Sequence, residues 1–167
     1  MSFGSDSVVL EFHEILKKAY SYGIILVAAA GNDGSFQPCY PARYPEVIAV
    51  GAIDSSDEVP TWSNKNPELT ALGVDILSTY PNDDYEVLSG TSMACPHVSG
   101  VAALIQAVRL KNDLPLLSPG NEDDYNENTI KGILHRTADD LSLTGYDMLY
   151  GYGVVRADKA IQEALGS

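Results

Sequence analysis

Residues 89–110 read SGTSMACPHVSGVAALIQAVRL, and this stretch contains most of the evidence about the fold. Apolar residues recur in it from Val98 to Val108 at the three-and-four spacing of a helix. Because small side chains let a helix lie close to its neighbours, we predict a central helix over residues 92–110 that packs against a sheet. The small residues in this helix are Ala94, Ser99, Gly100 and Ala103.

Continuous apolar runs precede this helix. Residues 24–30, IILVAAA, lead into the turn sequence GNDG, and residues 47–53 read VIAVGAI. Residues 69–77 contain two shorter runs that are broken at Gly73. Unbroken apolar runs are typical of parallel strands that are buried on both faces. The carboxyl end of such a strand is where α/β sheets form binding sites, which directs attention to the GNDG turn.

Helices are predicted before and after these strands. An apolar stripe over residues 8–22 ends at a glycine, and further helices are predicted at 129–137 and 157–165. Residues 112–128 mix proline, glycine, asparagine and acids without a period, so we expect a loop there. Strands and helices therefore alternate along the chain. The pattern predicts one α/β domain over residues 1–167, with a parallel sheet flanked by helices.

The charge balance is strongly acidic. Ten lysine and arginine residues against 23 aspartates and glutamates give a formal net charge of −13. Because no basic cluster is present to follow a phosphate backbone, we expect no nucleic-acid partner. No apolar run approaches the roughly 18 residues that a membrane span requires, so we expect no membrane span. The two cysteines have no metal-ligand spacing and are too few for a disulfide framework.

Ser92 stands at the start of the predicted helix, where a hydroxyl can act in two ways. Unpaired N–H groups and the positive end of the helix dipole stabilise negative charge there, which favours a nucleophile whose attack creates an oxyanion. A serine in this place is also a common helix cap, and the local sequence leaves both interpretations open. His97 follows five residues later, a rotation of about 500° along the helix. It therefore points about 140° away from Ser92 and does not serve as its base.

The string GTSMACPHVSG at residues 90–100 resembles the nucleophile motif of the subtilisin-like serine proteases, the subtilases or peptidase S8 family. Other segments are similar to the family in the same order and spacing: MSFG at 1–4, VAAAGN at 27–32, YPARYPEVIAVGA at 40–52 and GYGVVRA at 151–157. The resemblance covers essentially the whole chain. It implies the C-terminal part of a three-layer α/β/α catalytic domain.

The resemblance implies roles for particular residues. Ser92 is implied as the catalytic nucleophile, and Asn32, which would otherwise be a turn asparagine, as a catalytic oxyanion donor. Two backbone segments are implied to pair with an extended peptide substrate. Cys39 matches the bottom of the primary specificity pocket, where a small thiol leaves room for large apolar groups; a small buried residue is the alternative. The implied substrate-binding residues are Ser2, Phe3, Gly4, Ala29, Ala30, Gly31, Cys39 and Thr91.

The acid–base pair of the family is not matched in this chain. The catalytic histidine and aspartate come from motifs upstream of the residue matched by Met1, and neither motif occurs in residues 1–167. We expect His13 and His135 to be surface or packing residues. We therefore expect the nucleophile-bearing, C-terminal part of a serine endopeptidase domain, with little or no activity alone.

Two other functions compete with this one. The first is a non-catalytic subtilase half that binds peptide or assembles with a partner chain. The second is an α/β-hydrolase, which is disfavoured because Ala94 stands where its Gly-x-Ser-x-Gly elbow requires glycine.

Calcium is implied as a structural cofactor at two places. Asp140 and Asp147 flank a glycine-containing loop that resembles a calcium loop of some subtilases. Glu68, together with the backbone carbonyls of Ala42, Tyr44 and Val47, matches a second and weaker site, but Thr70 stands where relatives can supply another carboxylate.

The implied partners are polypeptide substrates, the missing N-terminal part of the catalytic domain or a propeptide, and a second copy bound through the interface that truncation exposes. No signal peptide is visible in the chain, and the resemblance implies a secreted, extracellular protein.

Overall fold

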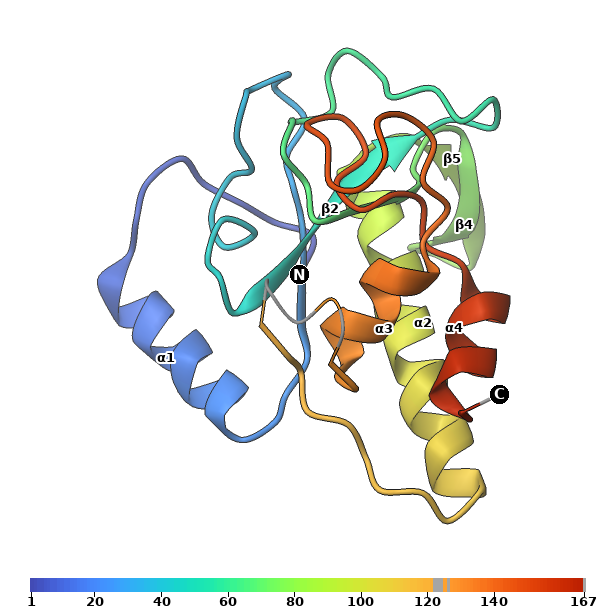
Figure 1. Ribbon diagram of the computed structural model, residues 1–167. Helices are drawn as coiled ribbons and strands as arrows, with labels where there is room; N and C mark the ends of the chain where they lie inside the picture. Colours follow the sequence, from blue (N-terminus) through green and yellow to red (C-terminus); the bar gives the residue numbers. More distant parts are fainter. Residues whose placement is uncertain (122–124, 126, 167) are drawn as a thin grey trace.

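The computed structural model describes residues 1–121, 125 and 127–166 (Figure 1). The predicted loop at 112–128 therefore falls partly outside the described residues, at 122–124 and 126. The helices and strands, in chain order, are α1 (Leu10–Ser21), β1 (Leu26–Ala29), β2 (Val47–Ile53), β3 (Leu69–Leu72), β4 (Ile76–Tyr80), β5 (Asp84–Leu88), α2 (Thr91–Lys111), α3 (Ile130–Thr137) and α4 (Ala157–Ala164).

Strands β1, β2 and β3 form a parallel sheet in that order. Val27 pairs with Ile48 between β1 and β2, and Ala52 pairs with Ala71 between β2 and β3. Every residue of the three strands except Leu72 is buried. This confirms the buried parallel strands predicted at 24–30 and 47–53 and the first of the two runs in 69–77. The second of those runs belongs to β4, which is mostly exposed and pairs antiparallel with β5, so it is not part of this sheet.

Helices cover both faces of this sheet. Alternate residues of β1 point to opposite sides: Val27 and Ala29 belong to the apolar cluster formed with α2, whereas Leu26 and Ala28 pack with Leu16 of α1. Helices α3 and α4 contribute to the cluster on the α2 side. In Figure 1, α1 lies to the left of β2, and α2, α3 and α4 lie to its right. The α/β class with a parallel sheet flanked by helices is confirmed.

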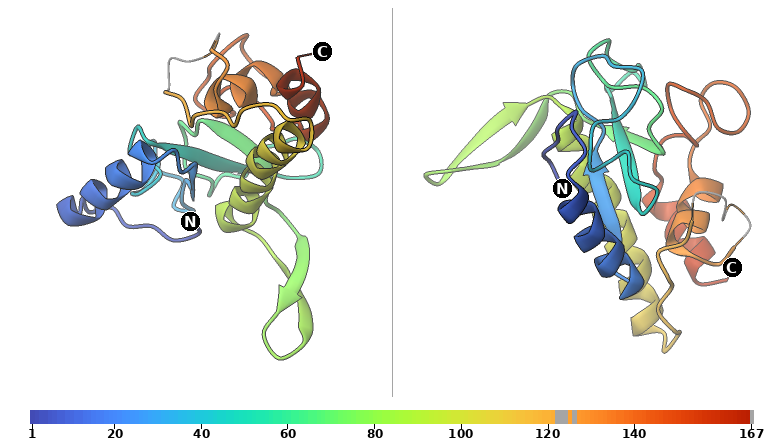
Figure 2. Two further views of the ribbon diagram at one scale, coloured as in Figure 1. Left: turned by 90° about the horizontal axis from the view of Figure 1, so that it is seen from below. Right: turned by 90° about the vertical axis from the view of Figure 1, so that its left-hand side faces the viewer.

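Strands β4 and β5 form an antiparallel hairpin that projects from the rest of the chain (Figure 2). Its turn contains Asn82 and Asp83, both at positive φ, a conformation that asparagine and aspartate tolerate better than most residues. Sequence analysis did not predict β5, because that strand is exposed over its whole length and has no apolar run. Leu77 and Val87 are paired across the hairpin and are 66% and 53% exposed.

Helix α2 packs against all three strands of the sheet. By length and composition alone it could cross a membrane, which differs from the expectation drawn from the sequence. One such helix is weak evidence for a membrane span, because the core helix of a soluble protein can have the same length and apolar composition. Buried Arg109 of this helix donates hydrogen bonds of 2.7 Å to the carbonyls of Pro115 and Ala164. We therefore interpret α2 as a core helix.

Candidate active site

Ser92 is the second residue of α2 and is half-buried. Its Oγ lies 3.5 Å from the carbonyl oxygen of Ser2, and the Ser2 hydroxyl donates a 3.1 Å hydrogen bond to the Ser92 carbonyl. N–H groups in the first turn of a helix have no carbonyl partner inside that helix. The hydroxyl therefore stands at the positive end of a 21-residue helix, next to the N-terminal segment of the chain.

Asn32 follows β1 and is tied to the same helix end through Thr91. The backbone N–H of Thr91 and its hydroxyl each donate a 2.9 Å hydrogen bond to Asn32 Oδ1. The Thr91 hydroxyl in turn accepts a 3.1 Å bond from the N–H of Gly31. Because a backbone N–H can only donate, the amide oxygen of Asn32 must face Thr91. The Asn32 Nδ2 group is thereby left to donate on the side away from Thr91.

Asn64 is a buried polar residue that sequence analysis did not single out. Its Oδ1 accepts 3.0 Å bonds from the N–H groups of Asp33 and Ser35, and its Nδ2 donates a 2.9 Å bond to the carbonyl of Ala30. Gly31 lies against it at φ +109, and a Cβ at Gly31 would come within 2.4 Å of Asn64 Nδ2. Asn64 therefore fixes the loop that carries Asn32. No local pattern around residue 64 indicates this, because its partners are about 30 residues away in the sequence.

The N-terminal segment runs beside β1. The Met1 nitrogen donates a 2.6 Å bond to the carbonyl of Val27, and the N–H of Ala29 donates a 3.0 Å bond to the carbonyl of Met1. Four residues later, Ser5 and Tyr40 exchange two backbone hydrogen bonds of 2.9 Å. Between these two anchors, the segment passes Ser92.

A cavity of about 190 Å³ lies between these segments. It brings together most of the predicted substrate-binding residues with Ser92 and Asn32. Ser2 and Ala30 are not among its lining residues: Ser2 contacts Ser92 directly, and the buried Ala30 has its carbonyl bonded to Cys39 and Asn64. The residues that line the cavity are Phe3, Gly4, Ser5, Asp6, Ala29, Gly31, Asn32, Asp33, Cys39, Thr91 and Ser92.

Cys39 and Gly4 lie against each other in this cavity. A Cβ at Gly4 would come within 2.2 Å of Cys39 Sγ. Burial raises the pKa of the Cys39 thiol, and its Sγ lies 3.7 Å from the carbonyl of Ala29. The thiol is therefore a neutral, half-buried group in the cavity wall.

Each of the three histidines has a partner other than Ser92. His97 Nδ1 lies 2.9 Å from the carbonyl of Met93 on its own helix. His13 Nε2 lies 3.0 Å from a carboxylate oxygen of Glu46. His135 Nε2 lies 2.7 Å from Glu68 Oε1 and its ring is stacked on that of Tyr152. None of these contacts provides a base for the Ser92 hydroxyl.

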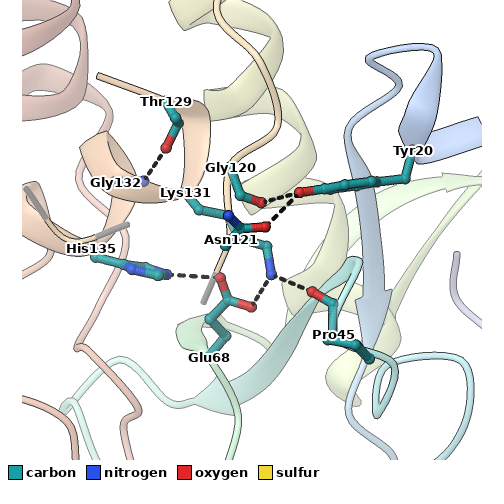
Figure 3. A network of polar contacts seen from close by, with 9 residues as sticks. All are labelled: Tyr20, Pro45, Glu68, Gly120, Asn121, Thr129, Lys131, Gly132 and His135. Carbon is teal, nitrogen blue, oxygen red and sulfur yellow. Dashed lines mark hydrogen bonds and ion pairs between the residues drawn. The ribbon is translucent and has the colours of Figure 1, made fainter. Parts of the chain in front are cut away.

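Glu68 lies in a buried network with Lys131 and His135 (Figure 3). Lys131 Nζ is 3.0 Å from Glu68 Oε2 and donates a second 3.0 Å hydrogen bond to the carbonyl of Pro45. The side chains of Lys131 and His135 are 1% and 0% exposed, and that of Glu68 is 11% exposed. Both carboxylate oxygens thus face groups of the chain itself, and one of these is already a cation. This arrangement does not fit a calcium ion held by Glu68.

Asp140 and Asp147 use their carboxylates within turns. Asp140 Oδ2 accepts a 2.7 Å bond from the N–H of Gly145. Asp147 Oδ1 accepts bonds of 2.7 and 2.9 Å from the N–H groups of Leu149 and Tyr150. In the described ranges, no group of three or more histidine, cysteine, aspartate or glutamate side chains could hold a metal ion. The calcium loop stays a prediction.

Comparisons with known proteins find similarity to one family. The model of the subtilase family matches residues 1–153. The chain is 41% identical over 164 residues to the thermostable alkaline protease of Halalkalibacterium halodurans, covering 97% of this chain and 41% of that protein. It is 48% identical over 114 residues to the major intracellular serine protease of Bacillus subtilis, covering 64% of this chain and 36% of that protein.

The fold agrees as well. The structure of the prenylagaramide maturation protease PagA superposes with a TM-score of 0.80 at 29% identity, covering 98% of this chain and 58% of that one. The chain thus spans less than two thirds of the length of these relatives. The family match over most of the chain, with similarity in sequence and in fold, shows that the chain belongs to the subtilase family.

Proposed function

We propose that this chain is the nucleophile-bearing part of a serine endopeptidase that cleaves polypeptides through an acyl-enzyme on Ser92. In this reaction a base takes the Ser92 proton and Oγ attacks the substrate carbonyl, whose oxygen becomes an oxyanion. The amide Nδ2 of Asn32 and the backbone N–H of Ser92 would stabilise that oxyanion. The observation that carries the proposal is the double hydrogen bond from Thr91 to Asn32 Oδ1, because it leaves Nδ2 as a donor near Ser92.

The general base and its orienting carboxylate are proposed to come from outside residues 1–167, in a longer chain or a partner chain. The engagement of all three histidines elsewhere supports this. An apolar cavity of about 370 Å³ beside the edge of β1 supports an additional packed segment there; it is lined by Met1, Ile25, Leu26, Val27, Ser99, Ala102 and Ala103. The exposed apolar pair of the hairpin, Leu77 and Val87, is a second surface of this kind.

Residues 1–167 alone are therefore proposed to be nearly inactive and prone to self-association through these surfaces. Sedimentation of the purified chain should show dimers or larger species. A strictly monomeric chain would contradict this part of the proposal.

Calcium at the Asp140–Asp147 loop and an extracellular location stay proposals. The relatives do not decide location, because one of them is named an intracellular protease.

The test uses the protein that contains this chain together with the segment supplying the base. A fluorophosphonate probe should label it, and Ser92→Ala should abolish labelling, whereas a folded His97→Ala variant should keep it. Asn32→Ala should lower kcat by about 10²- to 10³-fold, a magnitude that was established for this donor in subtilisin itself. Label retained in Ser92→Ala would refute the assigned nucleophile. Peptide binding without any labelling would support the non-catalytic alternative instead.

A further inference from the structure

We propose that the cavity beside Ser92 selects a lysine or arginine side chain on the residue whose carbonyl Ser92 attacks. This inference rests on the proposed function and adds the substrate class to it. It differs from the expectation that Cys39 leaves room for large apolar groups, because it considers the charge at the cavity as well as its size.

The charged residues that line this cavity are Asp6 and Asp33, and both are acidic. They come from two different segments, one directly after Ser5 near the N-terminus and one after β1, and both are exposed. The remaining lining residues are glycines and uncharged side chains. A cationic side chain that enters here would therefore meet two carboxylates and no lysine, arginine or histidine in the wall.

The backbone under both carboxylates is held in place. Asp33 donates its N–H to buried Asn64, at 3.0 Å. Asp6 follows Ser5, whose backbone forms two 2.9 Å hydrogen bonds with Tyr40. A charge on an anchored backbone loses less side-chain and backbone entropy when it pairs with a ligand than one on a free loop does.

The interior of the cavity suits the aliphatic part of a long basic side chain. Gly4 and the half-buried Cys39 lie against each other and form an uncharged part of the cavity wall. Lysine and arginine commonly place their methylene groups along apolar surface while the charged end reaches polar groups. The charge of the two carboxylates reaches the cavity wall. Burial is the main cause of the raised pKa of the Cys39 thiol, and the nearby Asp6 and Asp33 carboxylates also raise it.

Arg43 is the basic residue that could neutralise Asp6, since both line a neighbouring cavity. Its guanidinium instead lies over the ring of Tyr40, 5.5 Å from the centroid. Among the described residues, none of the ion pairs includes Asp6 or Asp33. The two carboxylates are therefore available to a cationic substrate.

The experiment compares peptide substrates that differ only in having arginine or its uncharged isostere citrulline at the cleaved residue. It uses the protein that contains this chain with its base-supplying segment. We expect a higher kcat/KM for arginine by about tenfold, and a loss of about two- to fivefold of this preference in each of Asp6→Asn and Asp33→Asn, the size expected of exposed ion pairs. The double variant should treat both peptides nearly alike. Added salt should reduce the preference in the same way.

Asp113→Asn is the matched control, because Asp113 is an exposed aspartate just beyond the opposite end of α2 from Ser92. It removes one negative charge and should leave the arginine preference unchanged. Equal kcat/KM for the two peptides in the unchanged protein would refute this inference while the proposed function stands. Absence of cleavage of any peptide would refute the proposed function.

A second measurement does not depend on turnover. The pH dependence of Cys39 alkylation, followed by mass spectrometry of the modified peptide, should move to lower pH in Asp6→Asn and Asp33→Asn but not in Asp113→Asn. An unchanged profile in both cavity variants would show that their charges do not reach the cavity wall, and would refute the inference.

Discussion

Replacing Glu68 by glutamine should destabilise the fold more than replacing its partner Lys131. Glu68→Gln keeps the shape of the side chain but leaves the Lys131 ammonium, 1% exposed, without its counter-charge. Removing one member of a buried ion pair costs about 3–5 kcal/mol because the remaining charge is uncompensated. Since Glu68 itself is 11% exposed and lines a surface cavity, water reaches it, and we expect the lower end, about 3 kcal/mol.

Lys131→Met should cost less than Glu68→Gln. The Glu68 carboxylate then keeps its 2.7 Å contact with His135, whereas Lys131 in Glu68→Gln keeps only neutral acceptors such as the Pro45 carbonyl. The double variant Glu68→Gln with Lys131→Met should be more stable than Glu68→Gln alone, because no buried charge is left unpaired. Lys17→Met, which removes an exposed ammonium paired with Glu14, is the matched control and should leave the free energy of unfolding nearly unchanged, because solvent screens this pair.

The assay is urea unfolding followed by the fluorescence of the single tryptophan, Trp62, with and without calcium. A loss below about 1 kcal/mol in Glu68→Gln, the range of exposed pairs, would refute the view that this is a strongly coupled buried network. If Glu68→Gln abolished a stabilisation by calcium that the unchanged protein shows, Glu68 would be a metal ligand and the interpretation of Figure 3 would be wrong.

Other predictions follow from single contacts. Gly4→Ala should lower kcat/KM of the complete protease by more than about tenfold, because its Cβ would come within 2.2 Å of Cys39 Sγ, and Cys39→Gly should restore part of the activity. Asn64→Ala should lower kcat more than it raises KM, and this effect should shrink in an Asn32→Ala background if Asn64 acts by placing the Asn32 amide. The Lys159 ammonium, with an arginine beside it, lowers the pKa of Asp139, so this carboxylate stabilises the fold above the usual carboxyl pKa of about 4 and the stabilisation is lost as the pH falls below it. The free energies of unfolding of Asp139→Asn and the unchanged protein, measured by urea unfolding, should therefore differ at neutral pH by no more than about 1 kcal/mol and converge in acid.

The sequence by itself determined the parts of this protein that depend on neighbours along the chain. The apolar run VIAVGAI predicts β2 over residues 47–53 with the bounds that the structure has, because a fully buried strand needs an apolar residue at every position. Helix α2 is predicted to within one residue at each end, because the three-and-four spacing of its apolar residues is a local property of the sequence. Ser92 and Asn32 were found through the family motifs around them.

Tertiary structure alone decided the contacts between residues far apart in the sequence. Glu68 meets Lys131 and His135 across 63 and 67 residues, and neither partner shows a metal-like or ion-pair spacing to it. The sequence therefore allowed a calcium ligand at Glu68, and the folded chain instead gives this carboxylate internal partners. Asn64 and the two carboxylates at the cavity became visible only when the loops that carry them were folded together. Local periodicity reports which residues are buried, but the identity of a buried polar group's partner depends on the three-dimensional path of the chain.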